Sequence, residues 1–184
     1  LRQRYHFKKL ILFIGTYFNP NIEAVNFIIN KLSQELKDCL FLIVGWVIWA
    51  FRMNVLPLNV KFLGRIDDDE LYKIMNIVDL AINPVVNGSG INIKMLDYLS
   101  AGLPVVSTRV GARGLGAVNG KHLIISELND FADSIKKVLS NQELSNRLRL
   151  NGRELVINNF LWDDIRDRMI EILKNNLKLT VQYI

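Results

Sequence analysis

The chain has 184 residues, of which 50% are hydrophobic and 22% are charged. This apolar fraction is too high for a disordered chain, and 11 Gly with 4 Pro are too few for a fibrous protein. The single cysteine, Cys39, cannot form an internal disulfide, which excludes a small disulfide-stapled secreted domain. The length suggests one domain with a substantial core.

The formal net charge of +5 suits an anionic ligand such as a phosphate. The basic residues are scattered and form no recognisable nucleic-acid-binding module, so nucleic acid is not expected as a partner. The longest apolar run, Cys39 to Phe51, is shorter than the about 20 residues that a membrane-spanning helix needs. No signal peptide pattern is visible, and we expect a cytoplasmic protein.

Short continuous apolar runs alternate with stretches of helical periodicity along the chain. The runs predict buried strands at residues 10–14, 40–44, 60–63, 80–86, 104–108 and 123–125. The periodic stretches predict helices at residues 22–36, 67–78, 91–100, 129–140, 142–158 and 161–178. This order indicates an α/β fold, a doubly wound parallel sheet of Rossmann-like type with about six strands and a C-terminal helical tail. Its ligands should bind beyond the carboxyl ends of the strands.

The segment richest in chemical signals is a glycine turn followed by a helix. Gly88 and Gly90 allow close approach of the backbone to a ligand, and the helix begins near Ile91. Unpaired N–H groups and the positive end of the helix dipole therefore meet at the turn, which is a ready anion site. Lys94 adds a charge in the first turn, and Asp97, about one turn further on, offers acceptors for sugar hydroxyls.

Residues 88–115, GSGINIKMLDYLSAGLPVVSTRVGARGL, resemble the nucleotide-sugar-binding half of retaining glycosyltransferases of the GT-B fold, family 4. Further landmarks of that family follow in order, and the resemblance covers about residues 10–175. They are Phe13-Ile14-Gly15, Asn19-Pro20-Asn21, Leu42 to Gly45, Val60 to Gly64, Asp69-Glu70-Leu71 and Asn159 to Trp162.

The resemblance implies transfer of a sugar from a nucleoside diphosphate sugar to an acceptor, with no cofactor and no bound metal. By position, the family pattern assigns Gly15, Thr16, Gly88, Ser89, Gly90 and Lys94 to the diphosphate and donor sugar, Asp97 to the ribose, and Gly64, Arg65 and Ile66 to the base. No residue is assigned as a catalytic base.

The resemblance also implies that half of the enzyme is missing. GT-B enzymes have two Rossmann-like domains, and residues 1–184 correspond to the C-terminal, donor-binding domain alone. The sequence starts at Leu1 without Met, so we expect a piece of a longer chain that is inactive without its N-terminal, acceptor-binding half. That half allows peripheral contact with a membrane. The final helix, around 162–176, is expected to cross back towards it.

The sequence departs from the family pattern at several positions. Ser89 stands where many members have an acidic residue, and Asp97 replaces the usual glutamate. No Arg or Lys occurs in residues 16–22, so Lys94 or Arg109 is expected to carry more of the diphosphate contact.

Five other residues carry structural expectations. Tyr98 and Ser100 replace small alanines of the family pattern and are expected to alter helix packing. His6, His122 and Cys39 are interpreted as structural or exposed, and they form no metal-binding set.

Two other functions remain open from the sequence. One is a non-catalytic nucleotide-sugar-binding or partner module that needs another chain. The other, more remote, is an NAD-binding oxidoreductase domain, suggested by the glycines of residues 111–116. Their G-x-x-G-x-G spacing differs from the G-x-G-x-x-G of dinucleotide-binding loops.

Overall fold

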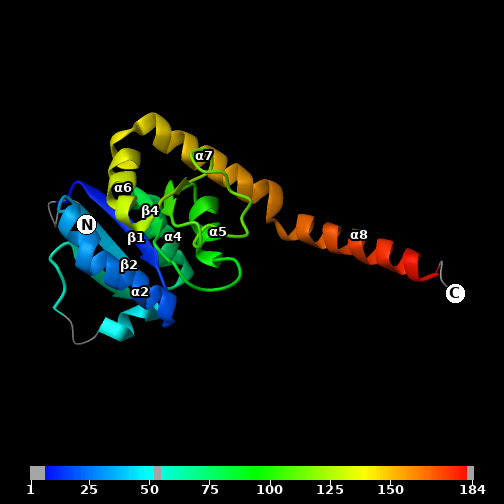
Figure 1. The fold of residues 1–184 in the computed structure, drawn as a ribbon, viewed down its shortest axis with the longest axis horizontal. Coiled ribbons are helices and arrows are strands. Elements are labelled where there is room, and N and C mark those ends of the chain that lie inside the picture. The colour runs from blue at the N-terminus through cyan, green and yellow to red at the C-terminus, as the bar shows by residue number, and fades with distance from the viewer. Residues whose placement is uncertain (1–6, 52–54, 182–184) are drawn as a thin grey trace.

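A computed structural model describes residues 7–51 and 55–181, and it shows one six-stranded parallel sheet with helices on both faces (Figure 1). The strand order is β3-β2-β1-β4-β5-β6. The strands are β1 (Lys9–Ile14), β2 (Cys39–Val44), β3 (Val60–Gly64), β4 (Leu80–Asn83), β5 (Val105–Ser107) and β6 (Ile124–Ile125). The predicted fold class is thereby confirmed. His6 lies outside the described residues.

The two faces of the sheet bury separate apolar clusters, because alternate residues of a strand point to opposite sides. Ile11 and Phe13 of β1 belong to one cluster, whereas Leu10 and Leu12 belong to the other. The helical segments are α2 (Asn19–Phe27), η1 (Ile28–Leu32), α3 (Ser33–Glu35), η2 (Trp46–Phe51), α4 (Asp68–Ile77), α5 (Ile93–Ser100), η3 (Leu128–Asp130), α6 (Phe131–Ser140), α7 (Gln142–Asn159) and α8 (Trp162–Val181). Helices α2 and α6 cover the first face, and α4 and α5 cover the second. Helix α7 contributes Leu144 and Leu148 to the first cluster and Val156 to the second.

Several predicted elements differ from the structure in their extent, and prolines explain two of these differences. The strand expected over residues 80–86 ends at Asn83, because Pro84 lacks the N–H that would continue the ladder. The helix expected over residues 22–36 begins at Asn19, with Pro20 in its first turn, where a missing N–H costs nothing. Its middle turn, η1, is a π-helix.

The sheet reverses its winding between β1 and β4. From β1 the chain passes to α2 on one face, and from β4 it passes to α5 on the other face. The two connections therefore diverge beyond the carboxyl ends of these strands. In open α/β sheets such a point of divergence leaves the crevice in which ligands bind.

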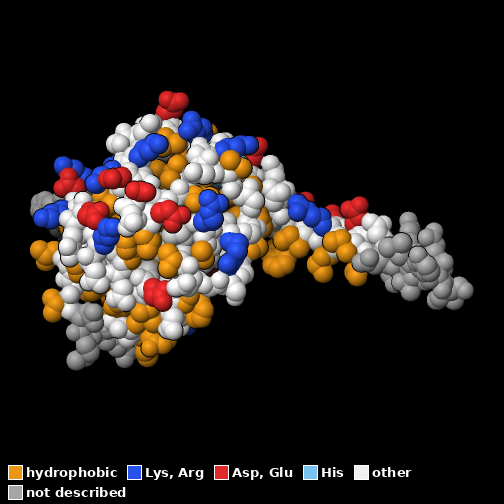
Figure 2. All heavy atoms as spheres, in the orientation of Figure 1, with side chains coloured by type: hydrophobic (Ala, Val, Ile, Leu, Met, Phe, Trp, Pro, Cys, Tyr) orange, Lys and Arg blue, Asp and Glu red, His pale blue; other side chains and the backbone are white. Residues whose placement is uncertain are grey.

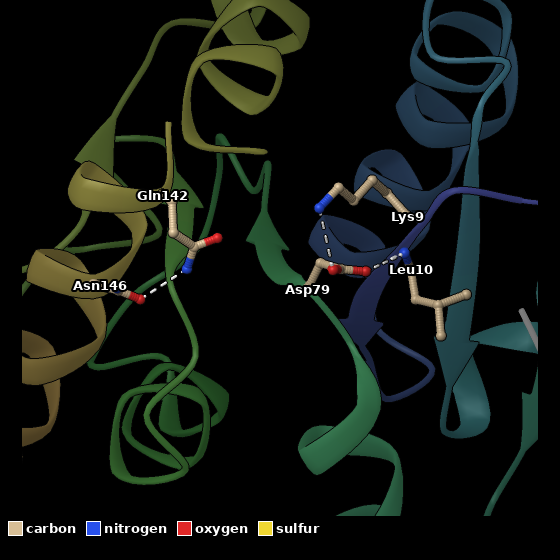
Figure 3. A network of polar contacts seen from close by, with 5 residues as sticks. All are labelled: Lys9, Leu10, Asp79, Gln142 and Asn146. Atoms are coloured by element: carbon tan, nitrogen blue, oxygen red, sulfur yellow. Dashed lines mark hydrogen bonds and ion pairs between the residues drawn. The ribbon is translucent and has the colours of Figure 1, made fainter. Parts of the chain in front are cut away.

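At the opposite, amino-terminal end of the strands, polar contacts link the start of β1 to the residue before β4 (Figure 3). The carboxylate of Asp79, just before β4, accepts a hydrogen bond of 2.8 Å from the backbone N–H of Leu10. Its other oxygen lies 3.5 Å from Nζ of Lys9. At this end of the strands, the polar groups of β1 and Asp79 bind one another.

Helix α8 extends from the compact body as a separate arm (Figure 1). Several of its large apolar side chains are exposed, and apolar atoms line one side of the arm (Figure 2). They include Trp162, Met169, Ile172 and Leu173. None of the helices in the described part of the chain combines the length and apolar character needed to cross a membrane.

Candidate functional site

A cavity of about 340 Å³ opens beyond the carboxyl ends of β1 and β4, at the point where the chain diverges to the two faces. Its walls come from the loop after β1, the start of α2, the glycine turn and the start of α5. The lining residues are Ile14, Gly15, Thr16, Phe18, Pro20, Asn21, Val85, Asn87, Gly88, Ser89, Ile91, Asn92, Ile93, Lys94 and Asp97. The cavity thus gathers segments from both halves of the sheet.

The glycine turn forms one wall of this cavity. Gly88 and Gly90 both adopt positive φ, at 125° and 75°, a conformation that residues with a Cβ atom rarely take. The guanidinium of Arg113 donates hydrogen bonds to the carbonyl oxygens of Gly88 (3.0 Å) and Gly90 (3.1 Å). The turn is therefore anchored through its carbonyl groups.

The amino end of α5 follows this turn and faces the cavity. The first turn of a helix has N–H groups without intrahelical acceptors, together with the positive end of the helix dipole. The side chain of Asn92, the N-cap residue, does not cap these groups, and its amide donates to the carbonyl of Gly111 at 3.3 Å. The end of α5 is therefore suited to binding an anion.

Lys94 is half-buried at this helix end, and its ammonium group is held on two sides. Its Nζ donates a 2.6 Å hydrogen bond to Oδ1 of Asn21 and lies 4.4 Å from the centroid of the Phe13 ring. Burial lowers the pKa of Lys94 to about 7. A negative ligand in the cavity would favour the charged form of this lysine.

Asn21 was not predicted as a site residue, yet it connects three parts of the wall. It lies in the first turn of α2 and is buried. Its Nδ2 donates to the carbonyl of Thr16 (3.1 Å) and to the Thr16 hydroxyl (3.2 Å), while its Oδ1 accepts the hydrogen bond from Nζ of Lys94. Neither Asn21 nor Arg113 has a sequence pattern of its own that marks this role.

Asp97 lines the same cavity one turn beyond Lys94, and its side chain is exposed. Partial burial raises the pKa of the Asp97 carboxyl, and the negative charge of Asp68 adds to the rise.

The next residue, Tyr98, is fully buried and reaches across to β1, where its hydroxyl accepts a 2.7 Å hydrogen bond from the N–H of Ile14. Tyr98 therefore fixes the distance between α5 and the end of β1.

The loop expected to meet the base does not line this cavity. The carbonyl of Gly64 accepts a 2.7 Å hydrogen bond from the N–H of Gly45, and the Arg65 guanidinium lies 5.8 Å from the Trp46 ring. Ile66 lines a separate pocket beside α4. The three residues are therefore not among those that line the cavity with the residues expected to hold the diphosphate and ribose.

Two other expected contacts have different surroundings. Gly15 lines the cavity, but its N–H donates to the carbonyl of Val44 at 2.9 Å and is engaged within the sheet. Arg109 is exposed and is not among the lining residues. The arginine that does contact the glycine turn is Arg113.

Gly111, the first glycine of residues 111–116, packs against the sheet. Its carbonyl accepts hydrogen bonds from the side chains of Asn83 and Asn92, each at 3.3 Å. A Cβ atom at Gly111 would clash with Oγ of Ser107. Close packing of the backbone explains this glycine.

The other candidate residues are structural. Cys39 is buried, which raises the pKa of its thiol to about 11. His122 is also buried, and its Nδ1 accepts a 2.9 Å hydrogen bond from the N–H of Val118. Within residues 7–51 and 55–181, no three His, Cys, Asp or Glu residues group as ligands for a metal ion.

Solved structures share this fold, among them a domain of a glycosyl transferase. The C-terminal domain of a glycosyl transferase group 1 family protein (LpcC) from Francisella tularensis matches 88% of this chain and 93% of its own, with a TM-score of 0.66 and 17% identity. Anabaena Alr3699/HepE in complex with UDP matches 95% of this chain and 51% of its own, with a TM-score of 0.76 and 17% identity. These likenesses show the fold.

Characterised and uncharacterised proteins are also similar in sequence. An uncharacterised 44.6 kDa protein in the cps region of Klebsiella pneumoniae is 26% identical over 90% of this chain and 45% of its own length. The phosphatidyl-myo-inositol mannosyltransferase of Mycobacterium leprae is 24% identical over 89% of this chain and 46% of its own. The chain spans less than half the length of these two relatives.

The family itself is shown by a match over most of the chain. The family model described as "Glycosyl transferases group 1" matches residues 8–141, which include every strand of the sheet and the whole lining of the cavity. The Rossmann-like fold and the cavity at its point of divergence agree with this match. The chain therefore belongs to the family of group 1 glycosyl transferases.

Proposed function

We propose that this chain is the donor-binding domain of a retaining glycosyltransferase and holds the diphosphate of a nucleoside diphosphate sugar in the cavity beyond β1 and β4. The observation that carries the proposal is the convergence of the uncapped end of α5 with the Lys94 ammonium group in one cavity. Both favour a negative ligand at the same place.

This arrangement also fits the chemistry of sugar transfer. As the bond between the sugar and the diphosphate breaks, negative charge develops on the departing phosphate oxygen. Positively polarised groups that are already in position stabilise that charge more than the ground state, and so accelerate the step. The N–H groups of α5 and Lys94 would have this role, with no bound metal.

With the diphosphate at this position, the ribose and the base of the donor can also be assigned to residues. We assign the ribose hydroxyls to the carboxylate of Asp97, which lines the cavity one turn beyond Lys94. The base is assigned to the loop of Gly64, Arg65 and Ile66, on the side of α4. Uridine is the first base to test, because the Anabaena protein is solved with UDP and with UDP-glucose.

Transfer to an acceptor is proposed to need a second domain. The relatives are about twice as long as this chain, and the apolar side of the α8 arm is exposed. We propose that such a domain, outside residues 1–184, supplies the acceptor site. If a separate polypeptide supplies it, the chain is a nucleotide-sugar-binding module rather than half of one enzyme, and a transfer assay on the full-length gene product distinguishes the two.

Isothermal titration calorimetry with UDP, GDP and ADP tests the proposal. We expect one of the three to bind with a dissociation constant between about 1 μM and 1 mM, the range of ordinary substrates. The matching nucleoside, which lacks phosphates, serves as control and should bind at least about tenfold more weakly. A folded chain that binds none of the three would overturn the proposal.

A further inference from the structure

Asn21 and Lys94 are far apart in the sequence but share a hydrogen bond of 2.6 Å between their side chains. The same asparagine binds both the carbonyl and the hydroxyl of Thr16. One amide group therefore connects α2, the loop after β1 and the amino end of α5. This contact crosses from one face of the sheet to the other at the point where the winding reverses.

The orientation of this amide is fixed by its neighbours. If Oδ1 and Nδ2 were exchanged, two donors would face each other at Lys94 and two acceptors would face each other at Thr16. Oδ1 must therefore point at Lys94. The lysine is confined further by the Phe13 ring, 4.4 Å from Nζ on another side.

We propose that Asn21 is a positioning residue that holds the ammonium group of Lys94 at the diphosphate site without neutralising it. The inference rests on the proposed function and adds a residue to it. A lysine side chain is flexible, and a donor ligand binds more tightly when the cation is already in position. The carbonyl oxygen of Asn21 provides that restraint.

A neutral amide has an advantage over a carboxylate at this position. An aspartate at residue 21 would restrain Lys94 equally well, but it would cancel the positive charge and repel the diphosphate. The titratable residues that line the cavity are Lys94 itself and Asp97. Glu23 and Arg113 lie nearby but bind Asn87 and the glycine turn. Whether the positive charge of Lys94 is available to the ligand therefore depends on the side chain at residue 21.

Asn21→Asp separates this role from a merely structural one. The probe is UDP-glucose, because its diphosphate has no proton that titrates near pH 6, unlike the terminal phosphate of UDP. In the unchanged protein, affinity should fall about tenfold from about pH 6 to about pH 8.5, as Lys94 loses its proton. In Asn21→Asp, the pKa of Lys94 rises, so affinity should be about tenfold weaker at pH 6 and nearly constant up to pH 8.5.

Asn92→Asp is the matched control, since it places the same charge in the same cavity, away from the hydrogen bond to Lys94. It should weaken binding at pH 6 but retain most of the decline towards pH 8.5. If Asn21→Asp retains the decline as fully as Asn92→Asp, the proposal is wrong.

A second measurement needs no nucleotide. The urea midpoint of the free protein should rise from about pH 7 to about pH 9 as the burial penalty on charged Lys94 disappears, and Asn21→Asp should abolish this rise. An unaltered rise overturns the inference even if no donor binds. Absence of donor binding by the unchanged protein instead overturns the proposed function.

If Asn21→Asp does not fold, Asn21→Ser replaces it, because serine lacks the restraint but adds no charge. Its affinity for UDP-glucose should be about fivefold weaker at pH 6 and should still decline towards pH 8.5. Unchanged affinity of the folded Asn21→Ser protein overturns the proposal.

Discussion

The two ends of the β1–β4 pair are built from similar polar groups but use them differently. At the amino end, the Asp79 carboxylate is satisfied by the Leu10 N–H and by Lys9, so charge and hydrogen-bonding capacity are taken up within the sheet (Figure 3). At the carboxyl end, Lys94 and the first N–H groups of α5 face a cavity. The polar groups are therefore satisfied within the protein at the amino end, whereas at the carboxyl end they line the cavity of the proposed ligand site.

The cause of this difference is the direction of the chain. At the amino ends, β1 and β4 lie side by side. The backbone N–H of Asp79 donates a 2.9 Å hydrogen bond to the carbonyl of Leu10, which brings the Asp79 side chain close to β1. Beyond the carboxyl ends, the chain leaves to α2 and α5 on opposite faces. Polar groups there cannot all reach each other, so space for a ligand remains.

Replacement of Lys94 by alanine should have the largest effect on the ligand end. We expect the affinity for the nucleoside diphosphate to fall about 100-fold at about pH 6, or about 2.7 kcal/mol, through loss of a charge-assisted contact. Calorimetry measures the change. Lys31→Ala is the control, because Lys31 also lies over a phenylalanine ring, at 5.8 Å from Phe27, but away from the cavity. Equal losses in both variants would contradict the assignment.

Asp79→Ala should have the converse effect at the closed end. Its loss leaves the Leu10 N–H without its carboxylate acceptor, and hydrogen bonds to charged groups contribute about 1.5–3 kcal/mol. We expect the free energy of unfolding to fall by about 2 kcal/mol, measured by urea denaturation. Nucleotide affinity of the folded variant should stay within about twofold. A large loss of affinity would mean that the two ends are coupled.

Asp97→Asn tests the ribose contact. We expect about tenfold weaker binding of the ribonucleotide, or about 1.4 kcal/mol, because an amide accepts hydrogen bonds more weakly than a carboxylate. The 2′-deoxynucleotide should lose less. Since the folded state raises the pKa of Asp97, ionisation of this residue opposes folding near neutral pH, so the variant should be at least as stable as the unchanged protein. A destabilised variant with unaltered binding would assign Asp97 to the fold instead.

The smallest expected effect is the pH dependence of stability that Lys94 brings. Its pKa is lowered on folding, so the unfolded chain binds more protons between about pH 7 and pH 10 and stability rises with pH in that window. We expect a contribution of about 1 kcal/mol from about pH 7 to pH 9, reduced by partial exposure of the side chain. Lys94→Met should remove it. The raised pKa of Cys39 acts in the opposite sense only above about pH 9.

The local pattern of apolar residues was sufficient to predict the order of strands and helices and the fold class. Continuous apolar runs predicted all six strands, and a helix was predicted after the glycine turn near its observed start at Ile93. The extents of β4 and α2 differed because single prolines, Pro84 and Pro20, end or begin an element whatever the apolar pattern around them. Membership of the family was also visible, because its landmarks follow in order along the chain.

The candidate site depended much more on the tertiary structure. The sequence by itself determined the fold class, the glycine turn and the choice of Lys94 and Asp97, since these are contiguous on one turn and one helix. Only the tertiary structure brought Asn21 to Lys94, placed Arg113 rather than Arg109 at the glycine turn, and set the loop of Gly64 to Ile66 outside the cavity. Periodicity reports which face of an element is buried, whereas contacts between distant residues depend on the order of strands in the sheet, which is decided by packing of the whole chain.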